Sequence, residues 1–583
     1  IRAHCLRGTS IVAVWTREEF ESARSDRGQC GREGGNGGIL VPPECRGVYF
    51  IGSPRRLTRP LLGQAWRHGL HEFRIPVAGQ WLPLPLPVLH RAQELRVRLH
   101  GAFLKLRDGV LRQIERRVER RRPEAPVPTP VVRRLSSMDA AVAAMLAGAR
   151  PGSDAVPGRV ILVCGNLAPG GAERQVANTL VGLARAGLRD VSLLAHVLNS
   201  GPARHDFHLG RLIEAGIPAR EIERVVRSSS DPAFPAVLHQ SGRALPEGVV
   251  VDIANLVVEF RRARPEVVHA WLDWDCVRAG LAAAIAGVPR IVLSGRNLAP
   301  YHFALYQPYM DAAYRGLAGL ANVHFLNNSR AGADDYADWI GIARERIRVI
   351  HNGIAAEDCA PLTETERAAE RLRHGIPAHC VLIGGVFRFA AEKDPLLWLD
   401  AAALIAQRLP SARFILFGQG QLQAEMRNRA ATAGIAERVT FAGVTDDPLR
   451  AMGMMDVFLL TSYGEGLPNV LIEAQAMGTA VVCTQAGGAP EAVAEGMSGT
   501  VVQQRDATRI AEAVLALAGD RAALARARRE GPRFVRARFG MARMIAETIE
   551  AYGLEMPAGA LSRDTSAGRS DPAEQPVRAL GAA

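Results

Sequence analysis

The sequence predicts an α/β protein with two doubly wound domains, because short apolar runs alternate with helix-like segments twice along the chain. The first series begins near Arg159 and the second near His351. Such alternation is typical of parallel strands joined by crossover helices, with the strands buried on both faces. Ligands of such sheets bind outside the carboxyl ends of the strands, so we expect the functional residues in the loops there.

Ten segments are the predicted strands of these two sheets. Those of the first domain are RVILVC, VSLLA, VVHAW, RIVLS and VHFLN, and those of the second are VLIGGVF, RFILFG, RVTF, DVFLL and AVVC. We assign residues 158–350 to a first Rossmann-like domain and residues 351–535 to a second. A chain of 583 residues is too long to fold around a single hydrophobic core, since domains average roughly 150 residues.

An N-terminal extension precedes the two domains. Residues 1–85 show no pattern that predicts a fold, and residues 86–157 combine a basic helix at 88–122 with a proline-rich linker. The helix has an apolar stripe among arginines, which fits a solvated face or attachment to an anionic membrane surface. Nucleic acid ranks last, because no aromatic residues are interleaved with the basic ones. The tail at 554–583 is predicted to be disordered.

Composition narrows the class of protein further. The eight cysteines are scattered without metal-ligand spacing, which is typical of reduced thiols in a cytoplasmic protein. No apolar run approaches the roughly 18 to 20 residues that span a bilayer. The net charge of +12 comes almost entirely from arginine, and the chain contains only two lysines, Lys105 and Lys393.

The most informative segment is SYGEGLPNVLIEAQAMG at 462–478, which follows the buried strand DVFLL. Its turn leads into a helix predicted over 467–477, with Pro468 in the first turn, where its missing N–H leaves no gap. The free N–H groups of that helix favour an anion beyond the end of the strand. Glu465 in the turn and Glu473 in the helix add two carboxylates, and this combination suits a nucleotide sugar.

Two cations and a glycine turn lie at the same predicted edges. Arg388 and Lys393 follow the first strand of the second domain, and a guanidinium with an ammonium can stabilise a leaving diphosphate. A surface Arg/Glu/Lys turn is the alternative. Gly170 and Gly171 follow the first strand of the first domain and let the backbone approach a ligand. A G-x-G-x-x-G motif is absent there, which disfavours a dehydrogenase.

These segments together resemble the retaining glycosyltransferases of family 4, which have the two-domain GT-B fold. GGAERQ, the HNGI segment at 351–354, the Arg388/Lys393 pair and EGLPNVLIEAQAMG with the following GGAPEAV match in order, and the resemblance covers about residues 158–550. It implies that the first domain binds the acceptor and the second the donor. It also implies that a helix at 536–553 returns to the first domain.

The resemblance also implies roles for individual residues. Glu465 would contact the donor sugar, and Glu473 would hold the ribose. Arg388 and Lys393 would neutralise the diphosphate, while the loop at 170–171 closes over the donor. The remaining donor contacts are the backbone amides of Gly466, Leu467 and Asn469.

The implied reaction moves a hexose-type unit, with retention, from a UDP- or GDP-linked sugar to a glycan or lipid-linked acceptor. It needs no cofactor and no metal ion, because catalysis consists of orientation and stabilisation of the leaving group. We therefore expect a cytoplasmic enzyme of polysaccharide or cell-envelope biosynthesis, with peripheral attachment to the inner face of the membrane as an alternative. A sugar-nucleotide epimerase and a non-catalytic sugar-nucleotide-binding protein remain the competing functions.

Two segments of the first domain stay open to more than one interpretation. Relatives carry a histidine near the donor sugar after the strand VVHAW, but here Trp271 or Trp274 occupies the expected position. His269 either takes that role or is structural, in which case the role is absent. Asp273 and Asp275 form a D-x-D triplet that suggests a metal site, but three residues match by chance. Arg296 and the neighbouring Asn297 are candidates for acceptor or phosphate contacts, or else a pair that stabilises a turn.

Overall fold

The computed structural model describes residues 137–556, except 202–203, 240–244, 356–358 and 378, together with the backbone of five short strands nearer the N-terminus. Residues 1–132 and 133–583 form separate units, and each is described by itself. The predicted helix at 88–122 and the predicted tail from residue 557 lie outside the described residues.

The N-terminal unit contains one sheet, in the segment for which the sequence predicted no fold. Its strands pair in the order β1-β2-β3-β4-β5. Their bounds are β1 (Ala3–Leu6), β2 (Ser10–Val14), β3 (Val48–Ile51), β4 (Glu72–Val77) and β5 (Gln80–Pro85). β5 is an edge strand, where prolines are tolerated because one row of N–H groups has no partner. Because of its prolines, the segment WLPLPLP was not recognised as a strand from the sequence.

The first large domain is a seven-stranded parallel sheet in the order β12-β11-β10-β9-β6-β7-β8. Its strands are β6 (Val156–Cys164), β7 (Val191–Ala195), β8 (Ala219–Glu221), β9 (Pro265–Trp271), β10 (Arg290–Gly295), β11 (Val323–Asn327) and β12 (Ile347–Val349). Its helices are α4 (Ser137–Leu146), α5 (Gly171–Arg185), α6 (Leu209–Glu214), α7 (Glu247–Ala263), α8 (Asp273–Ala286), α9 (Tyr309–Ala318) and α10 (Arg330–Ile340). Two apolar clusters fill the space between the sheet and its helices.

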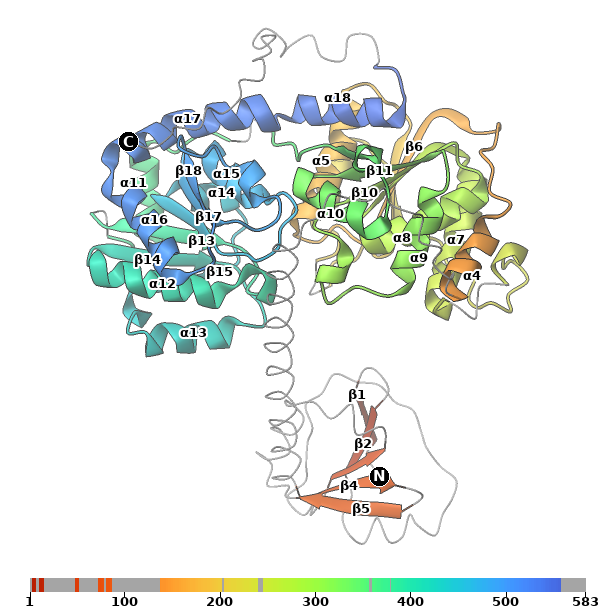
Figure 1. Ribbon diagram of the computed structural model, residues 1–583, viewed down its shortest axis with the longest axis horizontal. Coiled ribbons are helices and arrows are strands. Elements are labelled where there is room, and N and C mark those ends of the chain that lie inside the picture. Colours follow the sequence, from red (N-terminus) through yellow and green to blue (C-terminus); the bar gives the residue numbers. More distant parts are fainter. Residues whose placement is uncertain are drawn as a thin grey trace, which may run out of the picture. The chain divides into compact units, whose positions relative to one another are not determined.

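The second large domain is a six-stranded parallel sheet in the order β15-β14-β13-β16-β17-β18. Its strands are β13 (Val381–Val386), β14 (Ala412–Phe417), β15 (Val439–Gly443), β16 (Val457–Leu460), β17 (Ala480–Thr484) and β18 (Gly499–Val502). Its helices are α11 (Glu364–Arg373), α12 (Pro395–Arg408), α13 (Gln423–Thr432), α14 (Pro448–Gly453), α15 (Asn469–Ala476) and α16 (Ala507–Gly519). The prediction of two doubly wound domains is therefore confirmed (Figure 1).

The sequence missed three strands, β8, β12 and β18, all of which lie at or near sheet edges and are short. It also placed residues 86–157 outside the first domain, whereas α4 packs on that domain. Val142 of α4 is fully buried, and the Arg315 Nη2 atom of α9 lies 2.7 Å from the Asp139 Oδ1 atom. An alanine-rich segment carries no strong periodicity, so its packing partner was not evident.

The last two helices of the described residues are α17 (Arg521–Phe539) and α18 (Met541–Tyr552), which are separated at Gly540. α17 packs against α15 of the second domain, where the Gly531 backbone approaches the Gln475 carbonyl oxygen. α18 packs on α5 of the first domain, and Ile545 lies over Gly182. Figure 1 shows the two helices in blue, running from one domain to the other. The two helices thus contact both domains, α17 the second and α18 the first.

Candidate functional site

The loop after β16 is the centre of the candidate site. Glu465 is 6% exposed, and its Oε1 atom accepts hydrogen bonds from Ser462 Oγ at 2.6 Å and Lys393 Nζ at 2.5 Å. The Ser462 carbonyl oxygen in turn accepts a hydrogen bond from Thr484 Oγ1 at 2.6 Å. These contacts fix the carboxylate at the carboxyl edge of the sheet, with a cation beside it.

The two predicted cations of the second domain differ in their surroundings. Lys393 ends a short 3₁₀ turn, its side chain is 18% exposed, and it pairs with Glu465. The Arg388 side chain is 79% exposed, and its Nη2 atom lies 2.9 Å from the Glu392 Oε1 atom. Lys393 is therefore held in place beside Glu465, while the exposed side chain of Arg388 can turn toward a ligand.

α15 presents its amino end to the first domain. It begins at Asn469 with Pro468 as the N-cap, so it is shorter at its start than the predicted helix over 467–477. Pro468 has an extended backbone, with φ −72° and ψ 111°, which ends the helical geometry there. The Asn469 Nδ2 atom donates to the Gly171 carbonyl oxygen at 3.1 Å. The glycine loop of the first domain thus lies against the amino end of α15.

Glu473 lies on α15 and is 4% exposed. Burial raises the pKa of its carboxyl, and the nearby Arg174 guanidinium opposes that shift. Arg174 of α5 pairs with the Oε1 atom, whereas the buried Oε2 atom has no hydrogen-bond partner among the described residues. A buried acceptor without a partner is costly, so a ligand hydroxyl that donates to Oε2 would stabilise the site.

Both glycines of the glycine loop are tightly packed, and a Cβ atom on Gly171 would lie 3.1 Å from Asn469 Nδ2 of the second domain. Gly170 is the N-cap of α5, and a Cβ atom there would clash with the Glu173 side chain, which folds back over it. Burial raises the pKa of the Glu173 carboxyl, while the positive charge of Arg388 opposes that shift. The charges of Arg388 and Glu173, which belong to opposite domains, are therefore close enough to interact.

Arg296 follows β10 and reaches the same loop from the first domain. Its Nη2 atom donates to Asn352 Oδ1, and Asn352 Nδ2 donates to the Leu467 carbonyl oxygen at 3.0 Å and to Asn469 Oδ1 at 2.6 Å. The Arg296 backbone also touches Gly466. Sequence reasoning had not singled out Asn352, although it belongs to the HNGI segment that carried the resemblance.

Most of the predicted site residues meet around the loop after β16, and His269 contacts this group through Trp271, whose ring also stacks on the Arg296 guanidinium. The His269 ring is 1% exposed; the Nδ1 atom lies 2.8 Å from the Tyr552 hydroxyl of α18, and the ring packs against Trp271 at 5.0 Å. Burial, followed by the charge of Arg296, lowers its pKa well below the usual range. These are the contacts of a neutral core residue, and a catalytic role for His269 stays a prediction.

The D-x-D triplet does not form a ligand pair. Asp273 is buried and accepts hydrogen bonds from the hydroxyls of Tyr314 at 2.7 Å and Tyr336 at 2.5 Å. Asp275 instead lies 2.9 Å from the Nε2 atom of His196. Within the described part of the chain, no group of three His, Cys, Asp or Glu side chains could hold a metal ion. The two carboxylates therefore bind different partners, Asp273 two tyrosine hydroxyls and Asp275 a histidine.

Two further residues have local roles. Asn297 Oδ1 accepts a hydrogen bond from the Leu298 amide at 2.9 Å, which is the turn-stabilising interpretation. Ser329 caps α10, because its hydroxyl accepts a hydrogen bond from the Gly332 amide at 3.0 Å.

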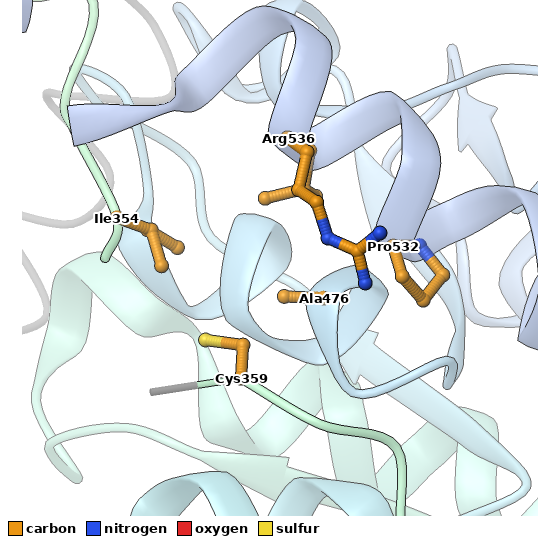
Figure 2. A pocket seen from close by; sticks show the side chains of 6 residues that line it. Ile354, Cys359, Ala476, Pro532 and Arg536 are labelled. Carbon is orange, nitrogen blue, oxygen red and sulfur yellow. The ribbon is translucent and has the colours of Figure 1, made fainter. Parts of the chain in front are cut away.

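One small cavity lies at the other end of α15. Figure 2 shows Ala476 there, with Ile354 and Cys359 on one side and Pro532 and Arg536 of α17 on the other. It encloses about 10 Å³, which is less than a bound sugar needs. A wider groove of about 450 Å³ runs along the first domain near Arg150 and Arg290.

Of the helices that the structure describes, none is long and apolar enough to cross a membrane.

Comparison with known proteins agrees with this geometry. Residues 169–358 match a family model described as Glycosyltransferase Family 4, and residues 378–520 match one described as Glycosyl transferases group 1. Together the two matches cover more than half of the chain.

Curated relatives match over part of their length. The chain is 34% identical over 371 residues to the Vi polysaccharide biosynthesis protein VipC/TviE of Salmonella typhi, covering 61% of this chain and 64% of the relative. It is 32% identical over 183 residues to the lipopolysaccharide core biosynthesis glycosyltransferase LpsE of Rhizobium meliloti, covering 31% of this chain and 50% of the relative. The chain thus spans less than two thirds of the length of these relatives.

Among solved structures, Anabaena Alr3699/HepE in complex with UDP and glucose superposes with a TM-score of 0.55 at 21% identity, covering 68% of this chain and 99% of that one. This likeness concerns the fold. With both family models matched in order across the two sheets, the chain belongs to the family 4, group 1 glycosyltransferases, which have the GT-B fold.

Proposed function

We propose that the protein transfers a sugar from a nucleoside-diphosphate sugar to a glycan or lipid-linked acceptor, with retention of anomeric configuration and without a metal ion. The observation that supports this most directly is the meeting of Glu465, Lys393 and the amino end of α15 with the glycine loop of the other domain. Family membership and the relatives named for polysaccharide and lipopolysaccharide biosynthesis support the same reaction class.

The proposed seat for the diphosphate is the space beside α15. Amides at the amino end of a helix favour an anion, and Lys393 supplies a positive charge on the same side. Arg388 can swing in from its exposed position, because its pairing with Glu392 is a surface contact of small energy. Stabilising the charge of the departing diphosphate is the main contribution these groups make to catalysis.

The two glutamates are proposed to hold the sugars of the donor. Glu473 Oε2 is a buried acceptor without a partner, which suits a ribose hydroxyl. Glu465 accepts from Ser462 and Lys393 through one oxygen atom, so its other oxygen is available to the transferred sugar. The acceptor hydroxyl then enters on the face that the leaving group vacates, which requires positioning by the first domain.

Hydrolysis of the donor without acceptor tests the proposal. A panel of UDP- and GDP-linked sugars is incubated with the full chain, and release of nucleoside diphosphate is measured; solved structures of the same fold hold UDP and UDP-glucose, so these come first. We expect slow release with one donor, and loss of at least about 100-fold in Glu465→Gln and Lys393→Ala, because each removes charge at the reacting centre.

Other outcomes identify the competing functions or a metal requirement. Binding of a donor without release of nucleoside diphosphate, together with unchanged binding in Glu465→Gln, contradicts catalysis and indicates a binding protein. Conversion of the sugar to its epimer identifies an epimerase. The same assay with and without EDTA addresses the metal ion, and we expect equal rates.

A further inference from the structure

Arg296 is a half-buried cation for which the described residues supply no carboxylate partner. Its Nη2 atom donates to Asn352 Oδ1, its Nη1 atom lies 3.4 Å from Ser294 Oγ, and its guanidinium stacks 4.2 Å from the centre of the Trp271 ring. The buried Nε atom has no partner among the described residues. Burial lowers the pKa of the guanidinium to about 9, so it remains charged at neutral pH.

Some other arginines are paired with carboxylates, such as the buried Arg371, which lies 2.8 Å from Asp456. The half-buried Arg290, Arg413 and Arg438 instead donate to backbone carbonyl oxygens. Among the described residues, the side chain of Arg296 pairs with Ser294 and Asn352 and with no carboxylate. Removing a charge from water is unfavourable unless an opposite charge compensates it. An anion from a ligand would supply the counter-charge that the described residues do not provide at Arg296.

The position of Arg296 indicates which part of a ligand carries that anion. The Arg296 carbonyl oxygen touches Gly466, the residue after Glu465, and Asn352 joins the guanidinium to the backbone of Leu467. Asn328 Oδ1 lies beside Gly466 and also has no partner, so an acceptor for a hydroxyl is available next to the cation. A sugar held by Glu465 would thus meet a hydroxyl acceptor and a guanidinium from the first domain.

The leaving diphosphate has its own positive groups. Lys393, Arg388 and the amino end of α15 all belong to the second domain, whereas Arg296 comes from the first. A guanidinium binds a carboxylate through two parallel hydrogen bonds, and stacking on Trp271 fixes the plane in which those donors point.

We propose that Arg296 binds a carboxylate on the transferred sugar, and that the donor is therefore a nucleoside-diphosphate hexuronic acid. The inference rests on the proposed transferase function and adds its substrate class. Trp271 holds the guanidinium in place and Asn352 orients it. A neutral hexose would leave the cation uncompensated and would bind less tightly.

Matched donors that differ only at C6 test the inference. Dissociation constants of the full-length protein are measured by calorimetry for UDP-glucose against UDP-glucuronate and for UDP-galactose against UDP-galacturonate, with the corresponding GDP-mannose pair. In at least one pair, we expect the acid to bind about tenfold or more tightly than the neutral sugar, the factor that a charge-assisted hydrogen bond provides. A wild-type protein that prefers the neutral member, or does not distinguish the members, overturns the inference.

Two variants assign the preference to Arg296. Arg296→Met should lose about tenfold in affinity for the acid while its affinity for the neutral partner changes by less than about threefold. Lys393→Met is the matched control, since a cation that serves the diphosphate should weaken both members of a pair equally. Equal weakening of both members by Arg296→Met would mean that the guanidinium binds a phosphate, and would overturn the inference.

The failure of this inference is distinguishable from the failure of the proposed function. If neutral donors bind and release nucleoside diphosphate, the transferase function stands and the inference fails. If no nucleotide sugar binds at all, the proposed function itself fails. The preference is measured first in the wild-type protein, so the test does not depend on the folding of a variant.

Discussion

Gly466 has no side chain at the point where the two domains meet. A Cβ atom there would lie 2.6 Å from Asn328 Oδ1 and closer still to the Arg296 carbonyl oxygen, both in the first domain. The second of these is a backbone atom, which cannot turn aside. The glycine is thus required by a close approach between domains, and the neighbouring Glu465 is positioned by the same approach.

We predict that Gly466→Ala lowers donor hydrolysis by about 100-fold, because a displacement of about 1 Å at a catalytic centre has an effect of this size. Gly464→Ala is the matched control in the same loop, since its Cβ would meet the nearest ring atoms of Phe303 at 3.7 Å, an ordinary contact. Steady-state release of nucleoside diphosphate measures both. Equal activity of the two variants would show that this approach is not needed for catalysis.

At the scale of elements, α18 belongs to the second half of the chain but packs on the first domain. Tyr552 is 1% exposed at its end, and its hydroxyl is the polar partner of the His269 ring. Arg290 Nη1 donates to the Ala551 carbonyl oxygen at 2.8 Å, which holds the last turn in place. The helix therefore completes the core beneath β9, and His269 is part of that packing.

Tyr552→Phe should lower the free energy of unfolding by about 1 to 3 kcal/mol, because it leaves a buried ring nitrogen without its partner. Tyr301→Phe is the control, since the Tyr301 hydroxyl bonds Asp335 at an exposed site and should contribute little. Urea unfolding measures stability, and donor hydrolysis by the folded protein should stay within about twofold of wild type. A large fall in turnover at unchanged stability would instead assign His269 to the reaction.

At the scale of the whole molecule, a carboxylate of the second domain caps a helix of the first. Glu491 accepts hydrogen bonds from the amides of Arg330 at 2.8 Å and Ala331 at 2.9 Å, and it lies 3.0 Å from His351 Nε2. Burial alone would raise the pKa of Glu491, but the hydrogen bonds from His351 and from these amides outweigh it, so the pKa lies below its usual value. Domain association is therefore coupled to pH.

The sign of the pH dependence follows from the lowered pKa. The carboxylate contributes its full stabilisation above the pKa of an unfolded glutamate, about 4.3, and loses it as the pH falls through the lower folded value. Glu491→Gln should thus lower stability by about 1 to 3 kcal/mol at pH 7, and the difference from wild type should shrink below about pH 4.

Thermal unfolding at a series of pH values from about 3.5 to about 7 measures this difference in stability. The Glu491 carboxyl is charged at the upper end of this range and becomes protonated toward the lower end. Glu495→Gln is the control, because Glu495 is exposed and accepts a single long hydrogen bond of 3.4 Å. A difference that stays constant down to the lowest pH would contradict the coupling.

The fold class, the family and most residues of the candidate site could be predicted from the sequence. Strand after strand could be recognised because buried parallel strands are continuously aliphatic, as in RVILVC and DVFLL. The glutamates and cations could be found because their motifs follow the ends of those strands, where such sheets bind ligands. These are local signals, and they are written in consecutive residues.

Features that depend on contacts between distant segments could be recognised in the folded protein alone. The tertiary structure placed His269 against α18, separated Asp273 from Asp275, added α4 to the first domain, and left Arg296 without a counter-charge. Each of these depends on partners far away in the chain, on their burial, and on how closely two backbones approach. The partners, their burial and the distance between two backbones cannot be predicted from local sequence, because they depend on how the elements pack together.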